Sequence, residues 1–356
     1  MREVAGATIA SGVDRLVATF ALGRSKRSRA RSRSESLGHQ ERMEALEALA
    51  ERHRAPRFGT APEVFFGDAG EAGAWLRSPV RALPSGRVVD VRWKSGYAPL
   101  ADEPDVLERL ARARENDWGH ARLFLHREPR PTAILIHGYL GGAYGVEERA
   151  WPVRWLFEQL GLDLAIPVLP FHGPRGKGTR PMFPAGDPRI NLEGFRQAVW
   201  DLISLRRALV ERGAPAVGMM GMSLGGYTTA LALTGDAELA FGIPFIPLAS
   251  IADFARDGGR LNGDPAEQAA QHAALEHAHA PVSPLSRPAL GADAAIRIVG
   301  ARSDRITPVS HARRLAEHFD AELTTFYGGH LLQLGRGDAF REVARMLSAR
   351  GLLWPR

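Results

Sequence analysis

Three residues of the kinds used in nucleophilic catalysis follow one another along the chain: Ser223, Asp304 and His330. Ser223 lies in the segment Gly221-Met-Ser-Leu-Gly225, which fits G-x-S-x-G, a pattern that holds a serine on a sharp turn between a strand and a helix. A serine hydroxyl is a poor nucleophile at neutral pH, so it needs a base to accept its proton and a third group to orient that base. The three residue types together supply these roles.

The sequence around Ser223 favours the strand-to-helix junction that the pattern requires. Residues 216–220 form a short apolar run typical of a buried strand, and residues 224–233 are small and compatible with a helix. Asp304 and His330 each follow a predicted strand as well, at 295–299 and 323–327. Because the carboxyl ends of parallel strands meet at one edge of a sheet, we expect the three side chains to meet there.

After residue 131, strand and helix patterns alternate regularly, which predicts an α/β protein with a mostly parallel central sheet and helices on both faces. Earlier strands are predicted at 88–93 and 121–126, and helices at 41–52 and 105–114. The later strands are expected at 133–136, 164–169, 216–220, 241–246, 295–299 and 323–327, and the later helices at 146–160, 192–212, 224–233, 311–319 and 340–350. The alternation of strand and helix patterns stops between 247 and 291, where we expect a small cap insertion with a helix at 265–279.

The N-terminal region differs in composition from the remainder, so residues 1–55 are expected to be an appendage and residues 56–356 the main domain. Ile9, Val13, Leu16, Val17 and Phe20 have helical spacing, which predicts an amphipathic helix. This helix is expected to pack on the main domain; a peripheral contact with a membrane surface is the alternative. An Arg/Ser tract at 23–35 is expected to be a solvated linker.

The part of the chain from about residue 131 to the C-terminus resembles the α/β-hydrolase superfamily. It shares the serine–acid–histidine order, the elbow at Ser223, the Asp304 turn, the Gly-Gly-His330 segment and a His137-Gly138 loop after an apolar strand. The whole chain is more loosely similar to α/β-hydrolase-domain proteins of unsettled substrate. The resemblance implies a cofactor-independent serine hydrolase that cleaves a small-molecule carboxylic ester, as a carboxylesterase or lipase-like enzyme does, through an acyl-enzyme.

The resemblance also implies a role for each residue. Ser223 would attack the acyl carbonyl, His330 would accept its proton, and Asp304 would orient the imidazole. By position, the backbone N–H groups of Tyr139 and Leu224 would bind the oxyanion. The same apparatus serves acyltransferases, thioesterases and peptidases. A non-catalytic binding protein with a basic N-terminal tail is the alternative of another class.

Several assignments have competing interpretations. Asp253 follows the predicted strand at 241–246 and is a rival for the acid. Asp304 could instead cap the helix that starts near residue 308. His137 is expected to brace its loop more than to transfer protons, and it is also a candidate for substrate binding.

The loop at 172–180 follows another strand, so it should border the pocket. Arg175, Lys177 and Arg180 in this loop either pair with an anionic part of the substrate or are solvated.

Composition excludes some classes of protein. The chain has no cysteine, so disulfides, thiolate metal sites and cysteine nucleophiles are excluded, and this suits a cytoplasmic protein. The net charge of +6 arises from six Lys and Arg residues at 24–33, so no nucleic-acid partner is expected. His272, His277 and His279 lack convincing metal-ligand spacing, so we expect no metal. No nucleotide-binding motif is present, and no apolar run reaches the ~18 residues of a membrane span.

Overall fold

A single nine-stranded sheet organises the computed structural model, which describes residues 39–54, 62–70, 73–177 and 180–353 together with Ala7, Ala10, Ser11 and Asp14. The strand order is β1-β2-β3-β5-β4-β6-β7-β8-β9. Strands β1, β2 and β3 pair antiparallel, β3 pairs antiparallel with β5, and β5, β4, β6, β7, β8 and β9 pair in parallel. The predicted mostly parallel sheet is therefore confirmed.

The strands have the following bounds: β1 Leu76–Leu83, β2 Gly86–Lys94, β3 Trp118–His126, β4 Thr132–Ile136, β5 Asp163–Pro167, β6 Val217–Met222, β7 Phe241–Phe245, β8 Ala295–Ala301 and β9 Glu322–Phe326. The α-helices are α3 His39–Arg52, α4 Pro62–Phe66, α5 Pro104–Ala111, α6 Tyr144–Ala150, α7 Pro188–Glu211, α8 Leu224–Leu233, α9 Ile251–Asp257, α10 Pro265–Ala278, α11 Val309–His318 and α12 Arg336–Ala349. Shorter turns are η2 Arg114–Asp117, η3 Trp155–Gln159, η4 Gly173–Arg175, η5 Ala280–Val282 and η6 Pro284–Ser286.

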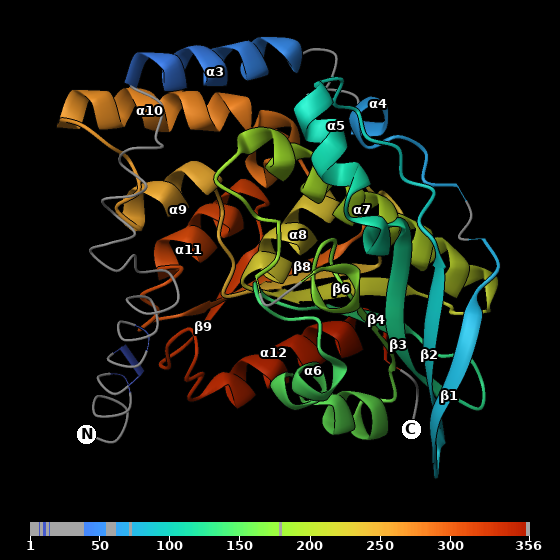
Figure 1. The fold of residues 1–356 in the computed structure, drawn as a ribbon. Coiled ribbons are helices and arrows are strands. Elements are labelled where there is room, and N and C mark those ends of the chain that lie inside the picture. The colour runs from blue at the N-terminus through green and yellow to red at the C-terminus, as the bar shows by residue number, and fades with distance from the viewer. Residues whose placement is uncertain are drawn as a thin grey trace.

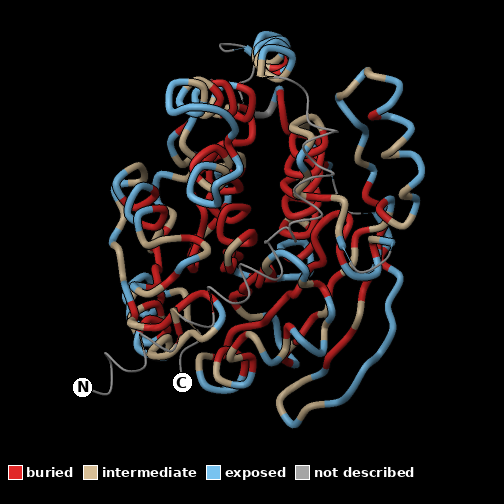
Figure 2. Tube along the Cα trace, turned by 60° about the vertical axis from the view of Figure 1, so that its left-hand side comes forward, coloured by how far each residue is buried: buried red, intermediate tan, exposed pale blue. Residues whose placement is uncertain are grey.

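Helices cover both faces of the sheet, with α7, α8 and α11 on one side and α6 and α12 on the other (Figure 1). Side chains of β4 alternate between the two layers: Ile134 and Ile136 pack with α7 and α8, whereas Ala133 and Leu135 pack with α12 and η3. Every residue of β4 is buried, and after Thr132 the strand is entirely apolar, as expected for a strand covered on both faces. Figure 2 shows buried positions gathered in the interior and exposed positions at the outer turns.

The connection between β7 and β8 contains α9, α10, η5 and η6, and α3 lies along α10 (Figure 1). Leu46 and Leu49 of α3 are buried, and the side chain of Gln271 in α10 lies 3.0 Å from the ring of His39. The predicted N-terminal appendage and the predicted cap therefore touch each other through α3. That segment 247–291 works as a cap over the site stays a prediction.

Two elements differ from the sequence-based expectation. The helix expected at 146–160 is broken: α6 ends at Ala150, and Trp151 is extended because it precedes Pro152. Strand β1 was not predicted, because its residues are almost all exposed and it contains Pro79, which is typical of an edge strand. The other predicted elements are present, with ends shifted by a few residues.

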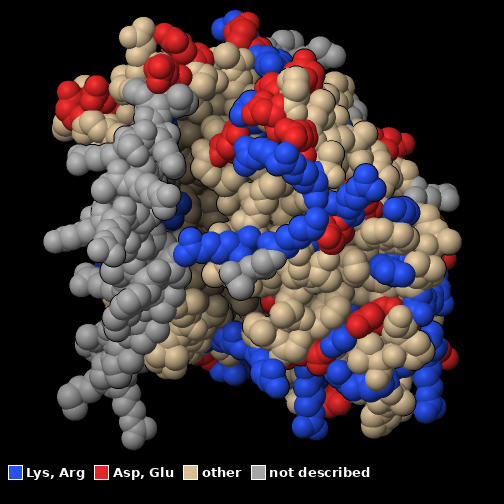
Figure 3. Space-filling view, viewed as in Figure 1, with Lys and Arg blue, Asp and Glu red and all other residues tan. Residues whose placement is uncertain are grey.

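The N-terminal predictions lie mostly outside the described residues. This applies to the five apolar positions of the predicted amphipathic helix and to the Arg/Ser tract at 23–35. Within the described part of the chain, no helix is both long and apolar enough to cross a membrane. On the face seen in Figure 3, Lys and Arg side chains lie among Asp and Glu side chains, so charges of both signs are interspersed.

Candidate active site

Ser223 occupies the turn between the end of β6 and the start of α8, with φ 57° and ψ −112°. A non-glycine residue adopts such a conformation only when its surroundings enforce it. The flanking glycines explain how: a Cβ on Gly225 would lie 2.2 Å from the carbonyl oxygen of Ile136, and one on Gly221 would lie 2.0 Å from that of Gly225. The missing side chains let the helix pack closely against the strands, and this packing presents the Ser223 hydroxyl at the carboxyl end of the sheet.

Three side chains from separate loops converge at this turn. Oγ of Ser223 lies 3.0 Å from Nε2 of His330, and Nδ1 of His330 lies 2.7 Å from Oδ2 of Asp304. Asp304 follows β8 and His330 follows β9. Both strands lie on the same side of β6 in the sheet, and β7 lies between β6 and β8. The side chain of Asp304 is fully buried, and His330 is 8% exposed overall. The structure thus brings the three predicted residues into one hydrogen-bonded chain.

The two carboxylate oxygens of Asp304 have different partners: one accepts hydrogen bonds from its own turn, and the other contacts His330. Its Oδ1 accepts hydrogen bonds of 2.8 Å from the backbone N–H groups of Ile306 and Thr307. The first residue before α11 is Pro308, so the carboxylate stabilises the turn ahead of the helix and does not cap it. Thr307, which the sequence did not single out, also contacts Oδ2 of Asp304 through its hydroxyl at 3.0 Å.

Asp253, the alternative candidate for the acid, makes ion pairs with residues other than His330. It lies in α9, where its carboxylate pairs with Arg314, with Arg256 at 2.8 Å and with His272 at 2.9 Å. Burial raises the pKa of Asp253, but hydrogen bonds and charges from these three neighbours hold it below its ordinary value. Asp253 therefore ties α9 to α10 and α11, and Asp304 is the carboxylate that contacts the candidate base.

The two predicted oxyanion donors flank Ser223. A Cβ on Gly138 would lie 3.5 Å from Cβ of Ser223, so the loop that carries Tyr139 runs beside the nucleophile. Leu224 is the first residue of α8, and its N–H has no partner within the helix. Neither backbone N–H donates to an atom of the described residues. The positive end of the α8 dipole points to the same place, which favours a negative charge there.

His137 and Glu147 shape the loop between β4 and α6. Nδ1 of His137 lies 2.8 Å from the carbonyl oxygen of Gly138, and its Nε2 accepts a 3.0 Å bond from the N–H of Leu169. Burial lowers the pKa of His137 to about 4, so the ring is neutral at pH 7. Glu147 accepts a 2.9 Å bond from the N–H of Gly142. Both ring nitrogens of His137 are occupied, so its assignment to substrate binding is wrong and it braces the loop.

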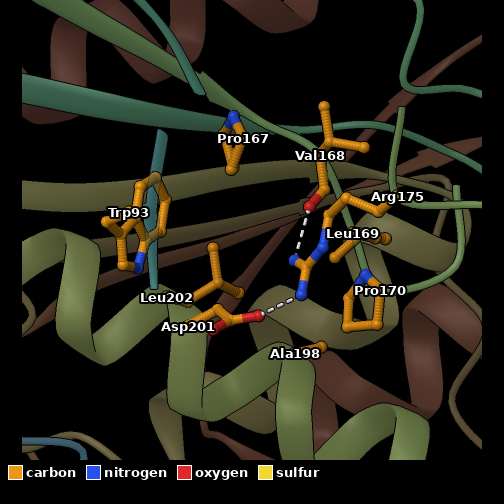
Figure 4. A pocket seen from close by; sticks show the side chains of 9 residues that line it. All are labelled: Trp93, Pro167, Val168, Leu169, Pro170, Arg175, Ala198, Asp201 and Leu202. Atoms are coloured by element: carbon orange, nitrogen blue, oxygen red, sulfur yellow. Dashed lines mark hydrogen bonds and ion pairs between the residues drawn. The ribbon is translucent and has the colours of Figure 1, made fainter. Parts of the chain in front are cut away.

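Arg175 does not face a substrate. It is 1% exposed, pairs with Asp201 at 2.6 Å and donates to the carbonyl oxygen of Val168 at 2.9 Å. Figure 4 shows it beside a small internal cavity that Trp93 and Leu202 also line. The prediction that Arg175 pairs with a substrate anion is therefore wrong, because the sequence did not reveal the buried carboxylate on α7.

The other two cations of the loop are exposed. Lys177 donates to the carbonyl oxygen of Arg112 at 3.1 Å and lies 3.4 Å from a carboxylate oxygen of Glu115. These contacts hold it against the turn before β3 and argue against a substrate role. Arg180 is exposed, and its contact with a substrate anion stays a prediction.

Segment 247–291 contains a group of potential metal ligands that the sequence did not suggest, formed by Asp253, His272 and Glu276. Arg314 already pairs with both carboxylates, at 3.4 Å in the case of Glu276, and Arg256 lies 3.2 Å from the ring of His272. Two guanidinium groups therefore supply the positive charge that a cation would bring. We interpret this group as an ion-pair network that joins α9 and α10 to α11.

No protein-family model matches the chain. Two uncharacterised proteins of Mycobacterium tuberculosis, from the strains CDC 1551 / Oshkosh and H37Rv, are each 32% identical to it over 267 residues. The match covers 73% of this chain and 63% of each relative, so the chain spans less than two thirds of their length.

Solved structures give the fold class. The acetyl xylan esterase from Paenibacillus sp. R4 is similar with a TM-score of 0.55 and 15% identity, over 84% of this chain and 98% of that one. Acetyl xylan esterase 1 from Thermoanaerobacterium sp. JW/SL YS485 has a TM-score of 0.52 and 14% identity, over 87% and 99%. Together with the sheet topology, this likeness establishes that the chain has the α/β-hydrolase fold.

Proposed function

We propose that the protein is a serine hydrolase that cleaves carboxylic esters without a cofactor. The observation that carries this proposal is the continuous chain from Oγ of Ser223 through the His330 imidazole to the Asp304 carboxylate, with separations of 3.0 and 2.7 Å. These are hydrogen-bond distances, and they join a nucleophile, a base and an orienting acid in the order that activation of a hydroxyl requires.

The first half of the reaction forms the acyl-enzyme. Nδ1–H of His330 donates to Asp304, which leaves Nε2 free to accept the proton of Ser223 as Oγ attacks the acyl carbonyl carbon. The carbonyl oxygen becomes an oxyanion, to which the N–H groups of Tyr139 and Leu224 donate. The imidazolium then gives its proton to the alcohol oxygen as the carbon–oxygen bond of the ester breaks, and the alcohol leaves.

The second half returns the enzyme to its starting state. A water molecule gives one proton to Nε2 of His330 while its oxygen attacks the acyl carbon, and the same two N–H groups bind the new oxyanion. The proton returns to Oγ as the bond to Ser223 breaks and the carboxylic acid is released. Preorganised donors of this kind each contribute about 10²–10³ to the rate in serine hydrolases.

The rim of the site favours an apolar acyl or alcohol group. Tyr139 is 37% exposed, Leu140 is 51% exposed, and Leu331, the neighbour of His330, is 47% exposed. The fold neighbours are named as acetyl xylan esterases, which agrees with ester cleavage and points to short acyl chains as the first to test.

A fluorophosphonate probe tests the proposal, since it reacts with an activated serine and not with an ordinary serine hydroxyl. Wild-type protein is expected to be labelled and to hydrolyse p-nitrophenyl esters, whereas Ser223→Ala is expected to do neither. Ser286→Ala, which removes an exposed serine of η6, is the matched control and should retain both properties. Equal labelling of the wild type and Ser223→Ala would sink the proposal. A graded series of acyl chains then defines the substrate.

The remaining interpretations predict other results with the same protein. Acyl transfer, thioester cleavage and peptide cleavage would all give probe labelling at Ser223, with weak hydrolysis of the p-nitrophenyl esters. A non-catalytic binding protein would show no labelling in any variant.

A further inference from the structure

Asp14 lies more than 300 residues before His330 in the chain, yet its carboxylate binds the loop that carries this histidine. Oδ2 accepts a 2.6 Å hydrogen bond from the backbone N–H of His330, and Oδ1 accepts a 3.0 Å bond from that of Leu331. The N–H of Arg305, next to Asp304, lies 3.4 Å from Oδ2. Asp14 is completely buried. A single carboxylate thus spans the loop of the candidate base and the loop of the candidate acid.

Residues next to Asp14 and His330 pack closely around the contact between the Asp14 carboxylate and the His330 loop. Arg305 donates through Nε to Oγ of Ser11 at 3.0 Å, one turn before Asp14. A Cβ on Gly329 would lie 2.5 Å from Oδ2 of Asp14 and 3.2 Å from the carbonyl oxygen of Ala10. A side chain at position 329 would therefore clash with Asp14, which approaches the backbone closely at this point.

Within the described residues, the loop itself offers no acceptor to the backbone N–H of His330. Gly328 donates to the carbonyl oxygen of Leu334, Gly329 donates to that of Leu332 at 3.0 Å, and the side chain of Gln333 donates to the carbonyl oxygen of His330 at 3.0 Å. Among the described residues, the N–H groups of His330 and Leu331 donate to Asp14 alone. Buried N–H groups that lose their acceptor are costly, so the loop would have to rearrange without this carboxylate.

We propose that Asp14 is a positioning residue of the active site: it fixes the backbone of His330 so that the imidazole lies between Ser223 and Asp304. This inference rests on the proposed function for its catalytic consequence. It makes Asp14, although it is distant from His330 in the sequence, part of the arrangement that holds the candidate base.

Full-length variants test the assignment. In Asp14→Ala the carboxylate is absent, and kcat for a p-nitrophenyl ester should fall on the order of 10- to 100-fold with little change in KM, because misplacement of a reacting group costs rate more than binding. Asp14→Asn retains one acceptor oxygen and should be intermediate. Gly329→Ala should also lower kcat, and its effect should be smaller in an Asp14→Ala background, since the clash is then relieved.

Asp163→Asn is the matched control. Asp163 is also a buried carboxylate that accepts backbone N–H groups, from His126 at 2.8 Å and Arg130 at 3.4 Å, but it lies at the amino end of β5. Its substitution should lower the melting temperature while kcat stays near the wild-type value. If Asp14→Ala lost stability to the same extent as Asp163→Asn and kept wild-type kcat, Asp14 would be a structural residue only.

Hydrogen exchange followed by mass spectrometry separates this inference from the proposed function. Peptides covering residues 328–334 should exchange faster in Asp14→Ala and Asp14→Asn than in the wild type, whether or not the protein hydrolyses esters. Unchanged exchange in these peptides overturns the role of Asp14. Failure of the fluorophosphonate probe to label Ser223 in the wild type, together with faster exchange in Asp14→Ala, overturns the proposed function and leaves the contact with the His330 loop established.

Discussion

The hydroxyl oxygen of Thr307 lies 3.0 Å from Oδ2 of Asp304, the carboxylate oxygen that also contacts His330. The same hydroxyl lies 2.9 Å from the carbonyl oxygen of Ile246, at the end of β7. The contact with Ile246 fixes the position of the Thr307 hydroxyl. Thr307 therefore limits how the carboxylate of Asp304 can rotate. The acid is thus held by its own turn on one side and by Thr307 on the other.

Thr307→Val should lower kcat by about fivefold, because it removes a hydrogen bond that contributes about 1 kcal/mol to the orientation of Asp304 while keeping the shape of the side chain. Thr307→Ser retains the hydroxyl and should stay close to the wild type. Steady-state hydrolysis of a p-nitrophenyl ester measures both. If Thr307→Val kept full activity, the Asp304 turn alone would be enough to orient the carboxylate.

Gly225→Ala should destabilise the protein strongly, since its Cβ would meet the carbonyl oxygen of Ile136 at 2.2 Å, where backbone must move. We expect the free energy of unfolding to fall by at least about 1–3 kcal/mol, as for other overpacked interior positions. Gly186→Ala is the control, because a Cβ there has no heavy atom within 4 Å. Urea unfolding compares the two variants, and equal midpoints would contradict the close packing at the elbow.

The sequence predicted most features of the fold that depend on short stretches of consecutive residues. The apolar strands, the G-x-S-x-G turn and the residues after β8 and β9 were recognisable because each signal lies in a few consecutive residues. The break at Pro152 was foreseeable from that proline alone, whereas β1 has no buried face that would mark it.

Contacts between distant segments were not predictable from the sequence. Arg175 looked like a loop cation because its partner, Asp201, lies on a helix 26 residues further on. Asp14 is a charged residue within the predicted amphipathic helix, and nothing in the sequence around it indicates that it accepts hydrogen bonds from the His330 loop. In both cases a charged residue is buried because of a partner that only the folded chain brings to it.

Stability should fall in mild acid because of buried histidines, among them His137 and His172. Burial lowers the pKa of His137 to about 4 and that of His172 to about 3, so the unfolded chain binds protons at these residues below pH 6.5 and the folded chain does not. Each group should then reduce the free energy of unfolding by about 1.4 kcal/mol per pH unit as the pH falls from 6.5 towards 4.

Urea unfolding at several pH values between 7 and 4.5 checks this dependence. His172→Phe removes one of the two groups and should flatten the decline. His277→Asn, at an exposed position of α10, should leave it unchanged. A decline in His172→Phe as steep as that of the wild type would show that His172 is not held neutral in the folded chain.

The neighbouring residues Glu147 and Glu148 should respond to pH with opposite signs. Burial raises the pKa of Glu147 despite the bond from the N–H of Gly142, so its charge is unfavourable in the folded state. Burial also raises the pKa of Glu148, but hydrogen bonds to Arg81 and Arg122 hold it below the ordinary value, so its charge is favourable there. Neutralising each residue with glutamine exposes the difference.

At pH 7, Glu147→Gln should be at least as stable as the wild type, because the amide oxygen can still accept from Gly142 and no buried charge remains. Glu148→Gln should be less stable at pH 7, because it loses its ion pairs. Both differences from the wild type should shrink as the pH falls through the range where the carboxylates become protonated, which urea unfolding at pH 7 and pH 4 measures. A loss of stability in Glu147→Gln equal to that in Glu148→Gln would mean that the loop between β4 and α6 depends on the charge of Glu147 and not only on its acceptor oxygen.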